Sequence, residues 1–144
     1  MLAYVFHTGT KYVDGRAGSK MFLIRTRVGP SRIHGNGVFA CESVSRGTEI
    51  WRFDPLFDRI ILDEELHALP PAFREFIEMY AYRSSDLDGR LVLSCDHAKF
   101  LNHSSDPNTR EVHFSSLASR EIESGDEITC NYGDFCVDWT GFGD

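Results

Sequence analysis

A polar turn at residues 100–109 concentrates side chains that could bind a ligand. Asn102 and Asn108 each carry amide donors and an acceptor, and His103 can donate or accept at either ring nitrogen. Asp106-Pro107 favours a bend behind these groups. Such a turn either satisfies its own polar groups, as an Asx-type turn between two strands does, or holds a polar ligand.

Two further blocks of the chain could take part in the same chemistry. Residues 34–40 contain Gly35 and Gly37, and residues 125–133 contain Tyr132. Glycines let a backbone approach a bound molecule closely, but they also make ordinary turns between strands. A tyrosine at the end of a strand commonly packs against a core. Each block alone therefore indicates little, and their combination and order carry the information.

In this order, the three blocks resemble the hallmarks of the SET-domain protein lysine methyltransferases. These hallmarks are a GxG block, an NHSxxPN block, and a third block that ends in Tyr-Gly. The match runs from about residue 22 to residue 133, and the short single-domain form is similar to the minimal viral and bacterial members. One departure is Ser105, where many members carry cysteine. The resemblance implies a mainly β fold of several small β-sheets with a short helical insert and a knot-like C-terminal crossing.

The resemblance also implies a function and a set of site residues. The methyl donor would be S-adenosylmethionine, and the acceptor would be a lysine side chain of a histone or another basic protein. Tyr132 takes the catalytic position. The implied cofactor-binding residues are Gly35, Asn36, Gly37, Asn102, His103, Tyr132 and Tyr80. The implied substrate-channel residues are Tyr82, Cys130, Phe135 and Trp139.

Methyl transfer to lysine demands alignment and exclusion of water rather than stabilisation of a new charge. The amine must be neutral when it reacts, and desolvation in an aromatic channel lowers its pKa. A tyrosine hydroxyl such as that of Tyr132, together with backbone carbonyls, can hold the amine and the donor methyl in line.

Two alternative functions stay open at this point. One is a small metallohydrolase that would use Cys95, Asp96, His97 and His103, but their spacing matches no helical or knuckle ligand pattern. The other is a catalytically silent SET-fold module that binds peptides, against which the tyrosine at position 132 argues.

The four cysteines contain no C-x-x-C pair, and we expect buried thiols rather than disulfides. Many relatives carry a zinc-binding cysteine segment after the final Tyr-Gly. Only Cys136 follows it here, so we expect no metal site.

Composition limits the domain count and the partners. With 144 residues, 42% of them hydrophobic, the chain is sized for one domain at residues 21–144, with a short C-terminal tail. Residues 1–20 form an extension of uncertain structure, for which a hairpin is one option. The net charge of −7 argues against binding nucleic acid and favours a basic protein or peptide partner.

The sequence shows no membrane-spanning run and no secretory leader, which predicts an intracellular protein. It would be cytoplasmic in a bacterium and nuclear or cytoplasmic in a eukaryote or virus. A homo-oligomer is compatible with the sequence.

The elements that must position the three blocks can be predicted from periodicity and turn residues. Strands are expected at residues 22–27, 38–41, 48–53 and 90–94, and a hairpin at 109–114 and 117–122. The chain then enters a strand that carries Tyr132. Residues 63–83 interrupt this β pattern, because Phe73, Phe76, Ile77 and Tyr80 share one helical face. Pro70-Pro71 is expected to start that helix. The tail either folds back over the adenine or lysine mouth through Phe135 and Trp139 or is frayed and disordered.

Overall fold

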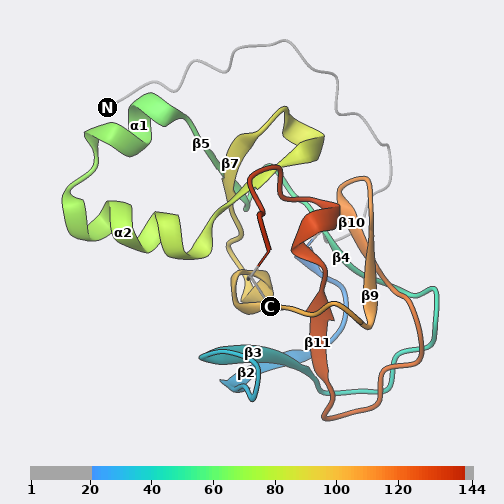
Figure 1. The fold of residues 1–144 in the computed structure, drawn as a ribbon. Coiled ribbons are helices and arrows are strands. Elements are labelled where there is room, and N and C mark those ends of the chain that lie inside the picture. The colour runs from blue at the N-terminus through green and yellow to red at the C-terminus, as the bar shows by residue number, and fades with distance from the viewer. Residues whose placement is uncertain (1–20, 142–144) are drawn as a thin grey trace.

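The computed structural model describes residues 21–141, which form three small β-sheets and a helical insert (Figure 1). This confirms the predicted mainly β fold, whereas the proposed hairpin within residues 1–20 lies outside the described residues. The sheet orders are β1-β4-β10-β9, β2-β3-β11-β8 and β5-β7-β6. The strands are β1 (Met21–Phe22), β2 (Thr26–Pro30), β3 (Asn36–Ala40), β4 (Glu49–Arg52), β5 (Arg59–Ile61), β6 (Tyr82–Ser84), β7 (Arg90–Leu93), β8 (Asn102–His103), β9 (Thr109–Val112), β10 (Ser115–Ala118) and β11 (Glu127–Cys130). The helices are α1 (Asp63–Ala68) and α2 (Pro71–Tyr80), with 3-10 turns η1 (Ser85–Leu87), η2 (His97–Phe100) and η3 (Tyr132–Asp134).

The main core lies between the first two sheets. On β3, Val38 and Ala40 alternate with the less buried Phe39, as expected for a strand with one face against a core. On β11, Ile128 and Cys130 are almost completely buried. Burial of one such aliphatic side chain contributes about 1.5–3 kcal/mol. The strand that leads to Tyr132 is therefore firmly anchored.

The strand predicted at residues 22–27 is divided in two. Met21–Phe22 pairs with β4, whereas Thr26–Pro30 pairs with β3 in the other sheet. The chain crosses from one sheet to the next between them, which periodicity cannot reveal because both halves are extended and no glycine or proline separates them. A second correction concerns Tyr132, which begins the turn η3 instead of lying in a strand.

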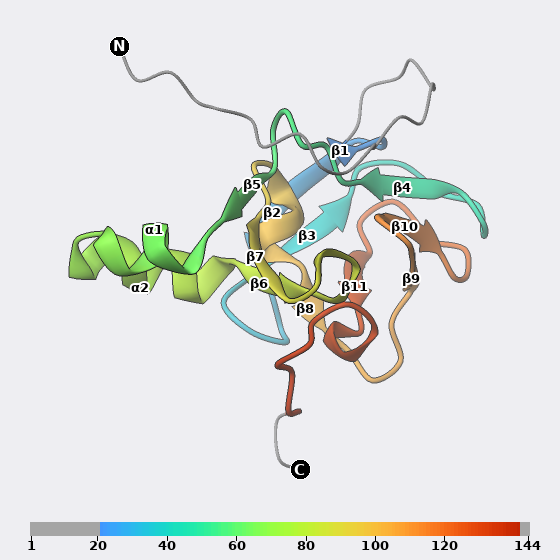
Figure 2. The same cartoon turned by 90° about the horizontal axis from the view of Figure 1, so that it is seen from above.

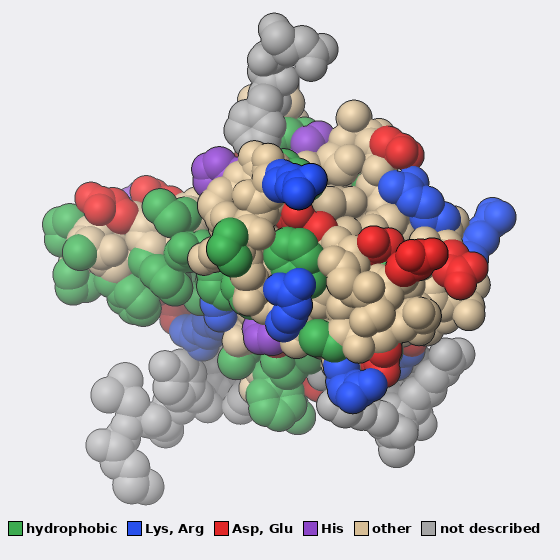
Figure 3. Space-filling view, turned by 90° about the horizontal axis from the view of Figure 1, so that it is seen from below, with side chains coloured by type: hydrophobic (Ala, Val, Ile, Leu, Met, Phe, Trp, Pro, Cys, Tyr) green, Lys and Arg blue, Asp and Glu red, His purple; other side chains and the backbone are tan. Residues whose placement is uncertain are grey.

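The helical insert projects away from the sheets (Figures 1 and 2). Helix α2 begins at Pro71, as predicted, and Ile77 packs in a second core with Ile61 and Leu91. The rest of its apolar face is only partly covered, with Phe73 51% exposed and Phe76 41% exposed. Figure 3 shows hydrophobic side chains gathered over this insert. Neither α1 nor α2 is long and apolar enough to cross a membrane, and residues 21–141 contain no other α-helix.

The β9–β10 hairpin forms where it was predicted, with shorter strands. Its turn residues His113 and Phe114 have φ angles of 32° and 62°, the left-handed conformation that tight hairpin turns require. The four cysteines are free thiols. The prediction that they are buried is right for Cys130 and wrong for Cys41 and Cys95, which are exposed.

Candidate functional site

Strand β11 brings the three sequence blocks together. It pairs antiparallel with β3, where Ile128 lies opposite Val38, and parallel with β8, where Cys130 lies opposite His103. The glycine turn therefore leads into β3 on one side of β11, the Asn102-His103 pair forms β8 on the other side, and Tyr132 follows the end of β11. Segments separated by more than 60 residues become adjacent in this way.

Asn102 connects the polar turn to the glycine turn. Its side-chain Nδ2 lies 3.1 Å from the carbonyl oxygen of His34, 3.0 Å from that of Asn36 and 2.9 Å from Oε1 of Glu127. An amide has two N–H hydrogens, which are shared among these three acceptors. Asn102 is 7% exposed, so this connection is buried.

The two glycines have separate structural causes. Gly35 has a φ of +48°, a conformation that side chains disfavour. At Gly37 a Cβ would lie 2.1 Å from Oε1 of Glu127, so any side chain there would force that carboxylate to move from its present position. Gly35 and Asn36 are exposed, and Gly37 is buried. Their roles toward a cofactor, and that of Asn102, stay predictions.

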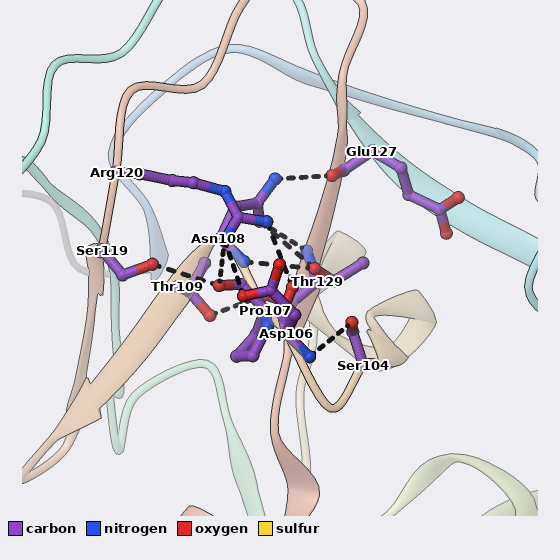
Figure 4. A network of polar contacts seen from close by, with 9 residues as sticks. All are labelled: Ser104, Asp106, Pro107, Asn108, Thr109, Ser119, Arg120, Glu127 and Thr129. Atoms are coloured by element: carbon purple, nitrogen blue, oxygen red, sulfur yellow. Dashed lines mark hydrogen bonds and ion pairs between the residues drawn. The ribbon is translucent and has the colours of Figure 1, made fainter.

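The second asparagine of the turn satisfies its polar groups within the protein (Figure 4). Asn108 Nδ2 donates to the carbonyl of Glu127 at 2.8 Å, and its Oδ1 accepts from the backbone N–H of Thr129 at 2.9 Å. Arg120 donates to the carbonyls of Asp106 and Pro107, at 3.1 and 3.2 Å. This half of the turn is the self-bonded structure that the sequence left as one alternative.

Tyr132 is held at both ends. Its hydroxyl donates to the carbonyl oxygen of Leu101 at 2.6 Å, and its backbone N–H donates to Nδ1 of His103 at 3.2 Å. Burial raises the pKa of the Tyr132 phenol well above its ordinary value, so the hydroxyl stays protonated and can donate. The ring of His103 packs against those of Tyr132 and Trp139, with centroids 5.3 and 4.8 Å away.

A cavity of about 640 Å³ opens beside Tyr132. The predicted residues that line it are Tyr80, Tyr82, Cys130, Tyr132, Phe135 and Trp139. The other predicted cofactor residues, which are Gly35, Asn36, Gly37, Asn102 and His103, do not line it. The structure therefore places Tyr80 with the channel residues, and His103 links the two groups through its contact with Tyr132.

The tail folds back over this cavity, which is the first of the two alternatives that the sequence left open. Phe135 packs edge-on against Tyr82 with ring centroids 5.0 Å apart, and Trp139 packs against Tyr132 at 5.0 Å. The backbone N–H of Val137 donates to the carbonyl of Arg83 at 3.0 Å. Burial raises the pKa of the Tyr82 phenol, and that of the Cys130 thiol, above their usual values, so both groups are neutral.

The cavity contains two polar groups that sequence reasoning missed. Glu111 on β9 is half-buried, and desolvation raises the pKa of its carboxyl to about 7. Trp51 on β4 is 7% exposed, and its indole N–H has no hydrogen-bond partner within residues 21–141. The only sequence feature that could have pointed to Glu111 was its position as an acidic residue in the middle of the strand predicted at residues 109–114. That signal is weak, because edge strands often carry acids.

The residues of the metallohydrolase alternative do not converge. The carboxylate of Asp96 accepts from the backbone N–H groups of Phe22 and Ala98 at 2.8 and 2.9 Å. Nδ1 of His97 lies 2.8 Å from Oγ1 of Thr26. Within the part of the chain that the structure describes, no three His, Cys, Asp or Glu side chains are grouped so as to hold a metal ion.

Comparison with known proteins agrees with this geometry. The SET domain family model matches residues 35–133. The chain has no significant match among curated proteins. Among solved structures, a humanized mutant of the Chaetomium thermophilum Polycomb Repressive Complex 2 bound to the inhibitor GSK126 is similar, with a TM-score of 0.59 and 21% identity over 80% of this chain.

This chain spans only 16% of the length of that Polycomb chain. A Plasmodium falciparum protein described as a candidate histone methyltransferase is similar at a TM-score of 0.54 and 22% identity, over 76% of this chain and 94% of its own. At these identities the solved structures establish the fold, and the family match covers most of the sequence. The chain therefore belongs to the SET domain family.

Proposed function

We propose that the protein is an S-adenosylmethionine-dependent methyltransferase that acts on a lysine side chain of a histone or another basic protein. The observation that carries this proposal is the position of Tyr132. Its protonated hydroxyl is fixed on the Leu101 carbonyl at the wall of a cavity lined by aromatic rings. Such an arrangement suits methyl transfer to an amine, which depends on alignment of the reacting groups and exclusion of water.

The donor set suits the proposed cofactor. The backbone of residues 34–37 is joined to the Asn102 amide, and the His103 ring packs against Trp139 at a tilt. Polar groups of this kind could hold an amino-acid moiety, and flat rings could hold a purine. When bound, S-adenosylmethionine would supply an electrophilic methyl group from its sulfonium.

The protein's own residues would orient the acceptor and exclude water. Tyr82, Phe135 and Trp139 form an apolar wall that could pack the aliphatic stem of a lysine and favour its neutral form by desolvation. The Leu101 carbonyl fixes the direction of the Tyr132 hydroxyl, because a 2.6 Å hydrogen bond restricts rotation of the phenol O–H.

Charge favours a basic partner over a nucleic acid. The chain has a net charge of −7. Acidic side chains outnumber lysine and arginine around the cavity, where the acids are Glu78, Asp86, Glu111, Asp134 and Asp138 and the cations are Arg83 and Lys99. An acidic mouth raises the local concentration of a cationic peptide.

The test is to incubate the purified protein with methyl-labelled S-adenosylmethionine and core histones, and separately with lysate proteins, beside the Tyr132→Phe variant. We expect label on lysine with the unmutated protein only, and no loss of activity with EDTA. Calorimetry of S-adenosylmethionine runs in parallel. Binding of a basic peptide without cofactor binding or labelling would instead identify a silent peptide-binding module. Hydrolysis abolished by EDTA would identify the metallohydrolase.

A further inference from the structure

Glu111 lies in a row of three side chains across the first sheet. Ser116 on β10 is opposite Trp51 on β4 and also opposite Glu111 on β9. Directly paired residues of an antiparallel sheet project from the same face. All three line the 640 Å³ cavity that Tyr132 also lines. The carboxylate of Glu111 therefore belongs to the wall of the candidate active site.

Glu111 is also close to the residues that surround the proposed lysine channel. Strand β9 is fixed beside β11 because Oγ1 of Thr109 donates to the carbonyl of Thr129 at 2.8 Å. Burial is the main reason why the pKa values of Tyr82 and Cys130 are raised, and the Glu111 carboxylate raises both further through its charge. Cys130 is two residues before Tyr132.

The carboxylate accepts one short hydroxyl hydrogen bond but has no cation. Oγ of Ser116 donates to Oε2 of Glu111 at 2.5 Å, and Oγ1 of Thr109 lies 3.5 Å from Oε1. Across residues 21–141, no lysine, arginine or histidine forms an ion pair with it, whereas the exposed Asp106 has one with Arg120. A half-buried carboxylate without a cation is less favourable than a solvated one, so it either binds a proton more readily or gains from a positively charged ligand.

The surrounding charges do not supply that cation. Asp134 on η3 and Asp86 on η1 both disfavour ionisation of Glu111, and His113 in the β9–β10 turn is already paired with Asp86 at 2.9 Å. Arg52 on β4 is paired with Glu49 of the same strand, which also accepts from Ser115 at 2.7 Å. The other titratable groups that line the cavity are Glu78, Tyr80, Tyr82, Arg83, Lys99, Cys130, Tyr132, Cys136 and Asp138.

We propose that the Glu111 carboxylate receives the ammonium group of the target lysine and removes one proton from it, an inference that rests on the proposed function. One N–H bond of the ammonium breaks, and one O–H bond forms at a carboxylate oxygen of Glu111. The products are a neutral amine, which can act as a nucleophile, and a neutral carboxyl group.

The energetics suit this transfer. With a pKa of about 7, Glu111 is partly ionised at neutral pH and is a stronger base than an ordinary carboxylate. Desolvation in the cavity lowers the pKa of the ammonium toward that of its acceptor. Proton transfer between neighbours also leaves two neutral groups in a poorly solvated site, which avoids an isolated buried charge.

The first experiment measures ammonium binding without any methyl transfer. The full chain is labelled with carboxyl-¹³C glutamate, and the Glu111 resonance is assigned by its loss in Glu111→Gln. We expect a titration midpoint near 7. The midpoint should fall when n-butylammonium chloride, a surrogate for the lysine side chain, is added, and it should not move with n-butanol. A midpoint that butylammonium leaves unchanged overturns the inference, whether or not the protein is a methyltransferase.

The second experiment follows kcat/KM for histone methylation against pH. In the unmutated enzyme, activity should rise through pH 7. In Glu111→Gln it should be about 10²-fold lower at pH 7 and should recover most of this loss near pH 10, where lysine loses its proton to solvent. The Glu111→Asp variant should keep the rise in kcat/KM near pH 7. The matched control is Glu121→Gln, which makes the same change at an exposed acid and should match the unmutated profile.

The results separate the two proposals. No methylation by the unmutated protein contradicts the proposed function, and the butylammonium titration still decides whether Glu111 receives an ammonium. Methylation by Glu111→Gln with an unchanged pH profile, in a sample whose circular dichroism is native, overturns the role of Glu111 alone.

Discussion

The hydroxyl of Tyr132 lies 2.6 Å from the carbonyl oxygen of Leu101, the residue immediately before the Asn102-His103 pair. Two residues that are 31 positions apart in the sequence are thereby joined through a backbone carbonyl, which no side-chain substitution can remove directly. The direction of the Tyr132 hydroxyl is a property of the fold at this point, and loss of the phenol O–H is the cleanest way to test its proposed role.

Replacing Tyr132 with Phe should reduce methyl transfer by at least about 10²-fold while the affinity for S-adenosylmethionine changes little, because the ring packing with His103 and Trp139 remains. The lost hydrogen bond should lower the free energy of unfolding by about 0.5–1.5 kcal/mol. Single-turnover assays measure the rate of methyl transfer, calorimetry measures the affinity for S-adenosylmethionine, and urea unfolding measures the stability. Unmutated rates in Tyr132→Phe would remove Tyr132 from the catalytic role.

Replacing Asn102 with Ala should weaken binding of S-adenosylmethionine by about 1–3 kcal/mol, because the buried amide holds the carbonyls of His34 and Asn36 in place. Calorimetry of the folded variant measures the change. An unchanged dissociation constant would make Asn102 a purely structural connection between the two turns.

The matched control is Asn108→Ala, in the same turn. Asn108 bonds only within the protein in the network of Figure 4, so its loss should lower the free energy of unfolding by about 2–3 kcal/mol. In molecules that remain folded, cofactor affinity should stay close to that of the unmutated protein. Urea titration gives the stability of both variants, so loss of fold and loss of cofactor contacts are distinguished.

Replacing Glu111 with Gln should remove a pH-dependent loss of stability. In the unfolded chain this carboxyl ionises near the ordinary glutamate pKa of 4.5, whereas in the folded protein its pKa is about 7. The folded state binds the proton more tightly, so its stability falls as pH rises from 4.5 to 7. Because the residue is partly solvated, we expect the variant to gain about 1–2 kcal/mol relative to the unmutated protein between pH 4 and pH 8.

Urea unfolding across this pH range measures that gain. The exposed Glu121→Gln variant should show no such change in the same window. A pH dependence that is identical in Glu111→Gln and the unmutated protein would mean that the Glu111 pKa is ordinary in the folded state.

The number of methyl groups added should depend on Cys130. This thiol is 1% exposed, lines the cavity and is a poor hydrogen-bond donor, so it leaves more room for a partly methylated amine than a phenol would. We expect the unmutated enzyme to reach at least dimethyl-lysine and Cys130→Tyr to shift the product toward monomethyl-lysine. Mass spectrometry at long reaction times decides this, with the exposed Cys41→Tyr as a control. Only monomethyl product from the unmutated enzyme would contradict the prediction.

The sequence by itself determined the family, the mainly β fold and the start of α2. Motif order is a property of the chain, and Pro71 restricts the backbone locally, so neither depends on distant contacts. The resemblance also led to Tyr82, Phe135 and Trp139, which the structure brings together around one cavity. The knot-like crossing stays a prediction.

Only the tertiary structure decided which polar groups face that cavity. Strand periodicity assigns Glu111 to one of two faces but does not say which face is buried, and that depends on β10, β4 and the folded-back tail. The tertiary structure also distinguishes the two asparagines of the turn, which have the same side chain. Asn108 bonds to the backbone of β11, whereas Asn102 connects the polar turn to the glycine turn. The hydrogen-bond partners of a polar side chain are set by segments distant in sequence, and only packing of the whole domain brings those segments within reach.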